Sequence, residues 1–385
     1  MTASTLNLRE RWFAQRDRLL TSPRFRDAAS RFAGTRPIAR QRARELFDLV
    51  AGFVYSQWLF ACVELKLFDR LAEAPLTAED LATQAKLPLL SAERLLEAAA
   101  SLGLTQARGV DEQQRTRYGL GPLGAAMVGN DAVKAMVEHH RALYADLADP
   151  LALLRSGRGT GELAQYWAYA GGHTSDRAPG ALPDARTAPY SALMSASQPL
   201  VAGQVLDAYP IGRHHKKLLD LGGGEGVFAA AALERSSRLQ AMVFDLPAVA
   251  DAARTRFARL GLADRAQAFG GDFHRDVLPE GADIVSLVRV IYDHDDEPAL
   301  AILRAARSAL PAGGTLLLAE PMAGAAGAEP MGAAYFGMYL LAMGSGRSRS
   351  AADLTALLTQ AGFGQVRQRP TALPLQAGLL LAKAI

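Results

Sequence analysis

Three acidic residues in the second half of the chain, Asp220, Asp245 and Asp272, stand at or just after the end of short apolar runs. Such runs predict buried strands, so the three carboxylates are expected at strand ends. In an open α/β sheet the carboxyl ends of parallel strands form the ligand-binding edge. Because a carboxylate accepts several hydrogen bonds at once, these acids suit a ligand rich in hydroxyl and amino groups, such as a nucleoside.

A glycine cluster directly after the first of these acids narrows the ligand class. The stretch 217–228 predicts a buried strand, a tight turn and a helix that begins near Val227. The cluster comprises Gly222, Gly223, Gly224 and Gly226. Glycine lets the backbone approach a ligand closely and tolerates the positive φ of such a turn. A dinucleotide fingerprint would need a glycine where Val227 stands, so an NAD-linked enzyme is disfavoured and S-adenosylmethionine (SAM) is favoured.

The two later acids fit the nucleoside part of SAM. Asp245 stands about twenty residues past the glycines, where a carboxylate accepts hydrogen bonds from both ribose hydroxyls. Asp272 can accept a hydrogen bond from the adenine amino group, and Phe273 offers an apolar wall to the adenine face. The glycine turn alone also fits a turn without a ligand, but motifs at several strand ends in the right order favour a nucleotide site.

Further strands and helices complete an α/β domain over residues 206–385. Apolar runs at 282–290 and 314–320 predict two more strands. The segments 248–260 and 297–310 predict helices that alternate with the strands along the chain. This alternation predicts a largely parallel sheet that binds its ligand at the carboxyl ends of the strands.

Residues 1–44 form a basic arm with eleven arginines and three acids. Leu8, Trp12, Leu19 and Leu20 predict helical pieces with a basic face, which suits contact with an anionic membrane surface. A solvated arm without a specific site is the alternative. The whole chain is nearly balanced at a net charge of +3, which gives no case for a nucleic-acid partner.

Residues 45–125 predict a helical module. A wide apolar face over 45–68 marks a helix buried against its own domain or a partner chain. The helix 91–102, preceded by another helix and followed by a hairpin, completes a winged-helix pattern, so a DNA-binding regulator is a rival class. That helix carries Arg94 as its only cation with two glutamates beside it, which a duplex would repel. We interpret the module as a dimerisation domain.

Residues 126–205 predict a mostly helical linker that could line a substrate cavity. The candidate lining residues are His139, His140, Tyr144, Trp167 and Tyr169.

Composition excludes several other classes of protein. Cys62 is the only cysteine and stands in an apolar helical stretch, so neither a disulfide framework nor a cysteine metal cluster is expected. We expect no segment with the uninterrupted apolar run of about twenty residues that crossing a bilayer requires. The arginine-rich N-terminus also lacks the apolar region of a secretory signal. We expect a soluble cytoplasmic protein whose basic arm is its candidate contact with the inner or intracytoplasmic membrane.

The order of these motifs resembles that of the SAM-dependent O-methyltransferases of the plant caffeate and bacterial small-molecule type, over nearly the whole chain. The matching stretches are 220–226, 244–247, 271–273 and 289–297. The resemblance implies a Rossmann-like domain with a mostly parallel seven-stranded sheet, an N-terminal winged-helix dimerisation domain and a homodimer. It also implies that Leu246 and Arg289 take part in binding SAM.

Within that family the chain is most similar to the hydroxyneurosporene (demethylspheroidene) O-methyltransferases of purple photosynthetic bacteria. The similar stretches are 45–55, 289–294 and 335–346. The similarity implies transfer of a methyl group to the tertiary C1 hydroxyl of an acyclic carotenoid. The alternatives are a phenolic or polyketide substrate, and a non-enzymatic regulator that kept the fold.

One departure from the family bears on catalysis. Members that act on phenols usually carry a histidine base in a His-Asp-Trp run, whereas here Tyr292 holds the histidine's position and His294 the tryptophan's. An aliphatic tertiary alcohol is too weak an acid to give its proton to either side chain in advance, so the proton is expected to leave as the oxygen attacks. We predict that Tyr292 orients the hydroxyl or relays its proton, with Glu320 and His294 as candidate acceptors. The alternatives are simple packing for Tyr292 and an exposed loop position for His294, and a second family carboxylate expected near Ser348 is absent.

The segment 331–343 is apolar and rich in methionine and aromatic residues, which suits a long flexible polyene. A core or dimer-interface helix is the alternative. The predicted substrate contacts are Tyr335, Phe336, Met338, Tyr339 and Met343.

No metal site is predicted. A divalent cation would need an acidic cluster, and the run that contains Asp293, Asp295 and Asp296 is interpreted as the start of the following helix, where carboxylates favour the helix dipole.

Overall fold

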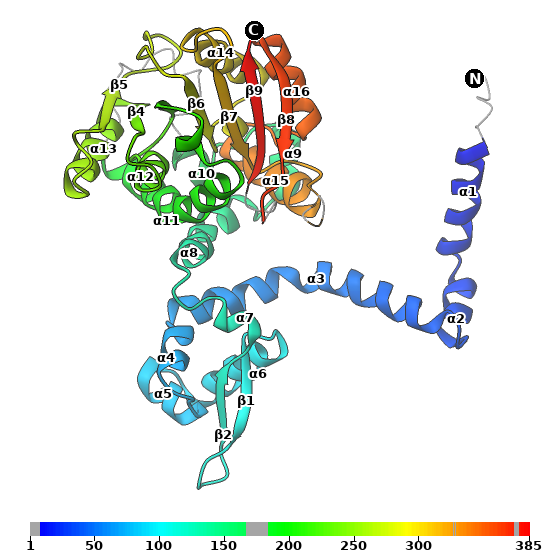
Figure 1. The fold of residues 1–385 in the computed structure, drawn as a ribbon. Helices are drawn as coiled ribbons and strands as arrows, with labels where there is room; N and C mark the ends of the chain where they lie inside the picture. Colours follow the sequence, from blue (N-terminus) through cyan, green and yellow to red (C-terminus); the bar gives the residue numbers. More distant parts are fainter. Residues whose placement is uncertain (1–7, 167–183, 326, 328, 373–376) are drawn as a thin grey trace. The chain divides into compact units, whose positions relative to one another are not determined.

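The computed structural model describes residues 8–166, 184–325, 327, 329–372 and 377–385. The chain divides into two compact units, Met1–Val128 and Gly129–Ile385, whose elements are drawn in Figure 1.

The first unit is helical and ends in a two-stranded hairpin. Its elements are α1 (Leu8–Thr21), α2 (Pro23–Arg31), α3 (Arg36–Glu64), α4 (Leu67–Glu73), α5 (Ala78–Ala85), α6 (Leu89–Ser101), β1 (Thr105–Val110), β2 (Thr116–Leu120) and α7 (Pro122–Ala125). Thr77 and Asp80 form a capping box at the start of α5, because each backbone N–H donates to the other's side chain, at 2.9 and 3.2 Å. Strands β1 and β2 pair antiparallel, so the predicted hairpin after the second helix is present.

Helix α3 begins well before the predicted start at residue 45. Among the residues of α3, all of which are described, only Cys62 and Val63 are buried, whereas Leu49 and Phe53 are 81% and 70% exposed. By length and composition α3 is apolar enough to cross a membrane, so the expectation that the chain has no such segment is wrong. Burial raises the pKa of the Cys62 thiol to about 12, which keeps it protonated as expected of a small core residue.

The second unit contains a seven-stranded sheet in the order β5-β4-β3-β6-β7-β9-β8. Its strands are β3 (Lys217–Leu221), β4 (Gln240–Asp245), β5 (Ala266–Gly270), β6 (Ile284–Val288), β7 (Thr315–Glu320), β8 (Phe363–Arg369) and β9 (Gly378–Ala384). The first five run parallel, and β9 pairs antiparallel with both β7 and β8. This mostly parallel Rossmann-like sheet confirms the predicted fold class.

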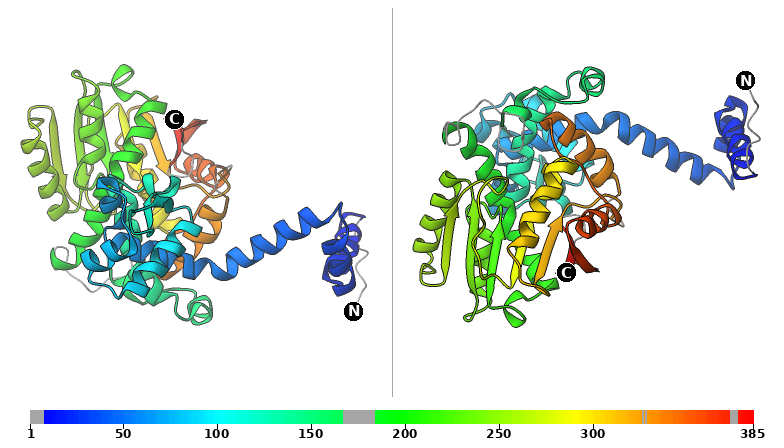
Figure 2. Two further views of the ribbon diagram at one scale, coloured as in Figure 1. Left: turned by 90° about the horizontal axis from the view of Figure 1, so that it is seen from below. Right: turned by 90° about the horizontal axis from the view of Figure 1, so that it is seen from above.

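Helices cover both faces of this sheet (Figures 1 and 2). The helices of the unit are α8 (Asp131–Asp146), α9 (Pro150–Ser156), α10 (Glu162–Tyr166), α11 (Asp184–Ala208), α12 (Val227–Glu234), α13 (Pro247–Arg259), α14 (Asp296–Ser308), α15 (Phe336–Met343) and α16 (Ala351–Gln360), with short helical turns η1 (Ile211–Arg213), η2 (Ile291–Asp293) and η3 (Met331–Tyr335). One apolar core lies between the sheet and α11, α12 and α13, and the other lies between the sheet and α14 and α16. The two cores pack against opposite faces of the sheet and leave the carboxyl ends of its strands to form the site.

The order of the strands shows at which point of the sheet a ligand should bind. From β3 the chain continues to β4 and β5 on one side, whereas β6 and β7 lie on the other. In an open α/β sheet the crevice at this reversal is where ligands bind, at the carboxyl ends of the strands. Residues that follow β3, β4, β6 and β7 therefore meet at one place.

Candidate active site

The glycine turn after β3 is a backbone cradle. Gly222 and Gly224 have φ values of 67° and 57°, which favour glycine. A Cβ on Gly222 would lie 2.8 Å from the Val290 side chain, whereas a Cβ on Gly224 would meet no protein atom within 4 Å. The turn is thus closed by protein at Gly222 and open for a ligand at Gly224.

The acids predicted at the strand ends surround this cradle. The Gly224 N–H donates to Asp245 Oδ2 at 2.8 Å, and Leu246 N–H donates to Asp245 Oδ1 at 2.8 Å. Asp220 is 1% exposed; its Oδ1 accepts from the Ser286 hydroxyl at 2.6 Å. Burial raises the pKa of Asp220 to about 7. A Cβ on Gly223 would lie 2.6 Å from Asp220 Oδ2, so the acid and the turn are packed together.

Beyond β5, Asp272 and Phe273 form one edge of the site. Asp272 Oδ1 accepts from the His274 N–H at 2.9 Å, and the Phe273 ring stands edge-on to the His294 ring at 6.0 Å. His294 is only 7% exposed, so the alternative of an exposed loop position is wrong. Burial lowers the pKa of His294 to about 4, which keeps the ring neutral at physiological pH.

The turn η2 carries the residues that follow β6. Glu320, at the end of β7, is 1% exposed, and its Oε1 accepts from the N–H groups of Val290 and Ile291 at 3.0 and 2.8 Å. Burial raises the pKa of Glu320 to about 7. One carboxylate oxygen thus holds the start of the turn, while Oε2 is buried and has no protein partner.

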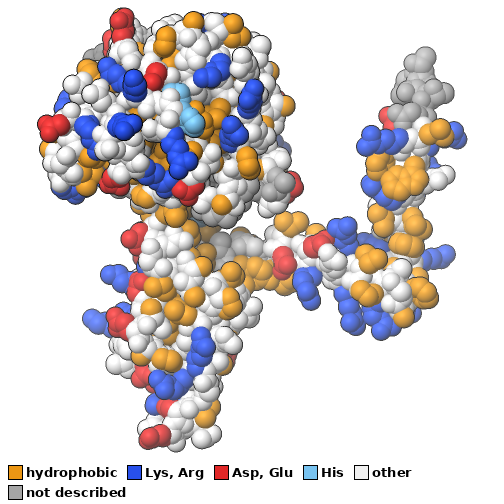
Figure 3. All heavy atoms as spheres, in the orientation of Figure 1, with side chains coloured by type: hydrophobic (Ala, Val, Ile, Leu, Met, Phe, Trp, Pro, Cys, Tyr) orange, Lys and Arg blue, Asp and Glu red, His pale blue; other side chains and the backbone are white. Residues whose placement is uncertain are grey.

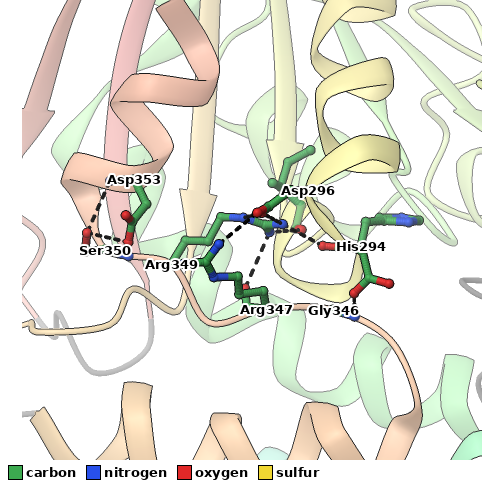
Figure 4. A network of polar contacts seen from close by, with 9 residues as sticks. His294, Asp296, Gly346, Arg347, Arg349, Ser350 and Asp353 are labelled. Atoms are coloured by element: carbon green, nitrogen blue, oxygen red, sulfur yellow. Dashed lines mark hydrogen bonds and ion pairs between the residues drawn. The ribbon is translucent and has the colours of Figure 1, made fainter. Parts of the chain in front are cut away.

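Arg349 also holds η2, through a network of polar contacts with Asp296 and His294 (Figure 4). It is 2% exposed and donates to the carbonyl oxygens of Ile291 and His294, both at 2.9 Å. It also pairs with Asp296 Oδ1 at 2.7 Å. Sequence reasoning missed this arginine. Its position one residue past Ser348, where a family carboxylate was expected, was the only signal for it.

Tyr292 stands in η2 and packs against apolar side chains. Its ring meets Phe336 edge-on at 5.7 Å and belongs to an apolar cluster with Tyr339, Leu340 and Met343. Burial, first of all, raises the pKa of Tyr292 well above its usual value, so the phenol stays protonated. The structure therefore brings Tyr292 together with the predicted substrate contacts, and His294 with the predicted adenine contacts.

The predicted substrate contacts form an aromatic wall. The rings of Tyr335 and Tyr339 stack at 5.9 Å, and helix α8 pairs each hydroxyl with a histidine. His139 Nε2 lies 2.9 Å from the Tyr339 hydroxyl and His140 Nε2 lies 2.8 Å from the Tyr335 hydroxyl. Burial lowers the pKa of both histidines, to about 4 for His139, so both pairs are neutral.

The remaining predicted contacts frame this wall. Met343 is buried and Met338 half-buried in the same cluster. The Tyr144 ring stands 6.1 Å from that of His140. Trp167 and Tyr169 lie outside the described residues.

Arg289 joins the strand end to helix α11. Its φ of 59° is unusual for a non-glycine residue, and strain of this kind concentrates at functional sites. The guanidinium donates to the Ser197 hydroxyl at 2.7 Å and to the Met194 carbonyl at 3.1 Å. Its Nε is buried and has no protein partner.

Comparison with known proteins identifies this arrangement. An O-methyltransferase domain family matches residues 144–364, and an O-methyltransferase dimerisation domain matches residues 47–130. The demethylspheroidene O-methyltransferase of Cereibacter sphaeroides is 42% identical over 95% of this chain and 93% of its own length. The chain belongs to the SAM-dependent O-methyltransferase family. This membership confirms the resemblance and decides against a non-enzymatic regulator.

One further relative supports the assignment, and one solved structure shares the fold. The demethylspheroidene O-methyltransferase of Rhodobacter capsulatus is 36% identical to this O-methyltransferase over 95% of its chain and 88% of the relative's. Human N-acetylserotonin methyltransferase, solved in complex with SAM, shares the fold with a TM-score of 0.73 at 24% identity, covering 89% of this chain and 97% of that one.

The cradle of this O-methyltransferase fits SAM. Among the described residues, the buried side-chain atoms that have no protein partner are Asp220 Oδ2, Arg289 Nε, Asp293 Oδ1, His294 Nδ1, Glu320 Oε2 and Ser348 Oγ. Three of these are carboxylate oxygens, and they suit a ligand that carries amino and hydroxyl donors and a positive charge. The open side of Gly224 gives the backbone approach that such a ligand needs.

The three acids Asp293, Asp295 and Asp296 of this O-methyltransferase take different places in the fold. Asp295 precedes α14 as its N-cap residue, and Asp296 at the helix start pairs with Arg347 at 2.8 Å as well as with Arg349. Asp293 does not begin the helix but lies buried in η2, so that part of the interpretation is wrong. Within the described part of the chain, no three His, Cys, Asp or Glu side chains converge as metal ligands.

Proposed function

We propose that this O-methyltransferase transfers the methyl group of SAM to the tertiary C1 hydroxyl of an acyclic hydroxycarotenoid. The observation that carries the proposal is the aromatic wall beside Tyr292, whose polar groups are neutral histidine–tyrosine pairs rather than charged side chains. Such a lining suits a long apolar substrate with one hydroxyl. The two demethylspheroidene O-methyltransferases among its relatives support the same substrate class.

We assign the donor's parts to the residues around the cradle. The proposed SAM contacts are Asp220, Gly222, Gly223, Gly224, Asp245, Leu246, Asp272, Phe273 and Arg289. His294, which lies beside Phe273, is assigned to the adenine side of the site rather than to proton transfer. The proposed substrate contacts are Tyr335, Phe336, Met338, Tyr339 and Met343.

The proposed catalytic contribution is alignment. SAM supplies an electrophilic methyl group when bound, and the protein has to hold the hydroxyl oxygen in line with it. Such alignment can lower a barrier by roughly 7–11 kcal/mol at best. Glu320 fixes the turn on which Tyr292 stands, and the neutral Tyr292 phenol orients the substrate hydroxyl.

Replacing Tyr292→Phe tests that orienting role. The ring contact with Phe336 is kept and one buried hydroxyl is lost, so we expect turnover to fall about 10-fold with little change in stability. Because the phenol is neutral at ordinary pH, the shape of the pH–rate profile should not change. Tyr209→Phe, which also removes one tyrosine hydroxyl, here one that is hydrogen-bonded to His215, is the control. Equal turnover in the two variants would remove Tyr292 from the mechanism.

The substrate class is tested by comparing initial rates on acyclic carotenoids that carry a C1 hydroxyl with rates on a panel of phenols and polyketides. We expect kcat/KM for the hydroxycarotenoid to exceed that for every phenol by at least about 100-fold, since an apolar pocket gains roughly 1–3 kcal/mol for each group that it fits. Higher kcat/KM on a phenol would replace the carotenoid by the phenolic alternative.

We also propose that the enzyme works in the cytoplasm at the surface of the inner or intracytoplasmic membrane, through α1, α2 and the start of α3. Figure 3 shows basic and hydrophobic side chains interspersed over these helices. Trp12 and Phe32 are 59% and 67% exposed, and residues 1–44 carry eleven arginines against three acids. Exposed apolar side chains among cations suit an anionic lipid surface, from which an apolar substrate could enter.

Sedimentation with lipid vesicles tests this contact. Binding is expected to phosphatidylglycerol vesicles, to weaken with salt and to be weak on phosphatidylcholine. Arg24→Glu with Arg26→Glu should weaken binding at least about 30-fold, because each arginine near the surface contributes about 1 kcal/mol. Arg238→Glu, exposed in the second unit, is the control. Vesicle binding that the double variant leaves intact would contradict the proposal.

For the exposed apolar face of α3 we propose a protein partner and not the membrane. The dimerisation domain family matches residues 47–130, which include most of the apolar residues of α3. We propose that a second copy of this chain covers Leu49, Val50 and Phe53 in a homodimer.

A further inference from the structure

Asp293 is a buried carboxylate, and one of its two oxygens has no hydrogen-bond partner in the protein. It stands in η2 and is 3% exposed, and its Oδ1 has no protein partner. A buried ionised carboxylate is costly unless it is paired. Arg349 and Arg347 bind Asp296, and the nearby Arg289 donates to Ser197 and Met194 with only its Nε left without a protein partner.

Its position lies between the two halves of the site. Val290, three residues before it, closes the glycine cradle at Gly222, and Tyr292 beside it contacts the aromatic wall through Phe336. Tyr292 is the neighbour of Asp293 in η2, and its side chain lowers the pKa of the Asp293 carboxyl. Glu320, which also has a free oxygen, already uses its other oxygen to hold the backbone of η2.

Methyl transfer from a sulfonium to an alcohol changes the charge of this buried space. The alcohol oxygen forms a bond to the methyl carbon, the carbon–sulfur bond breaks with its electron pair left on sulfur, and the hydroxyl proton is released. A positive sulfonium thus becomes a neutral thioether, and one proton needs an acceptor. A carboxylate that takes this proton keeps the total charge of the buried groups unchanged.

We propose that Asp293 is this acceptor, ionised while the positively charged donor is bound and protonated once the donor has become S-adenosylhomocysteine (SAH). The proposal rests on methyl transfer from SAM and not on which alcohol is methylated. It gives the enzyme a proton acceptor that the family's histidine position, here Tyr292, cannot supply.

The charged and titratable groups around Asp293 favour this change of its protonation state. Burial first, and then the neighbouring Glu320, raise the pKa of Asp293 well above its usual value, while Tyr292 and Arg289 lower it. Tyr339, from α15, faces it as a neutral phenol. The carboxyl therefore favours its protonated form on its own. A nearby positive charge favours the ionised form, and loss of that charge favours protonation again.

Proton-linked calorimetry tests the proposal without any alcohol present. SAM and SAH are titrated separately into the full-length protein near pH 7, in two buffers that differ in ionisation enthalpy, which gives the protons exchanged on binding. We expect the SAH complex to hold more protons than the SAM complex, by a large fraction of one. In Asp293→Asn the difference should vanish while both ligands still bind, which also shows that the variant is folded.

A further variant locates the proton. Asp295→Asn, an exposed neighbour two residues away, should keep the difference. The proposal is overturned if the SAM and SAH complexes hold equal numbers of protons, or if the difference persists in Asp293→Asn. Turnover of Asp293→Asn should in addition fall at least about 100-fold.

Discussion

Arg349→Met is expected to destabilise the second unit by roughly 2–6 kcal/mol, because it leaves two buried carbonyl oxygens without a donor, at a cost of about 1–3 kcal/mol each. The carbonyls are those of Ile291 and His294, at the two ends of the turn that carries Tyr292. Displacement of that turn should also lower turnover at least about 100-fold at temperatures where the variant is folded. Thermal unfolding together with methyl-transfer rates measures both effects.

Arg347→Met is the matched control for this variant. Arg347 pairs with the same Asp296, but its side chain is 58% exposed, against 2% for Arg349. An exposed pair contributes about 1 kcal/mol or less, so this variant should unfold close to the wild type. Similar losses in the two variants would show that the contact with Asp296, and not the hold on η2, stabilises the site.

Gly224→Ala is expected to weaken SAM binding at least about 100-fold while the protein stays folded. A Cβ at this position would meet no protein atom within 4 Å, so it would stand in the space where we place the ligand. The added cost to folding is that of a non-glycine residue at a φ of 57°, roughly 1–2 kcal/mol. Calorimetric titration with SAM and thermal unfolding separate the two effects.

Gly261→Ala isolates the backbone cost. Gly261 has a φ of 67° and an equally open side, but it follows α13 away from the cradle. It should lose the same stability and keep the wild-type affinity for SAM. The assignment of the cradle fails if Gly224→Ala binds SAM as tightly as Gly261→Ala does.

The sequence predicted the strand ends well, because local signals determine them. Apolar runs that end in Asp220 and Asp245, with glycines at positions of positive φ, specify strand, turn and helix without help from distant residues. The fold class followed from the alternation of these units. Family resemblance predicted the seven-stranded sheet and the O-methyltransferase activity, both of which are confirmed.

The parts that the sequence did not reveal depend on contacts between distant segments. Arg349 reaches η2 from more than fifty positions away, and His139 meets Tyr339 across 200 positions. In the sequence, Asp293 has the pattern of an acid at the start of a helix, as Asp295 does. Its burial depends on the packing of distant segments. The wide apolar face of α3 was predicted to be buried against its own domain or a partner chain, and the exposure of Leu49 and Phe53 leaves the partner chain as the cover to be tested.

The most direct test of the account follows a labelled methyl group. The purified enzyme is incubated with SAM labelled in its methyl carbon and with an acyclic carotenoid that carries a C1 hydroxyl, and the products are separated and analysed by mass spectrometry. The account predicts a carotenoid heavier by one labelled methyl group, with the label in a methyl ether at C1. A carotenoid that stays unlabelled while a phenol offered in the same reaction gains the label would contradict it.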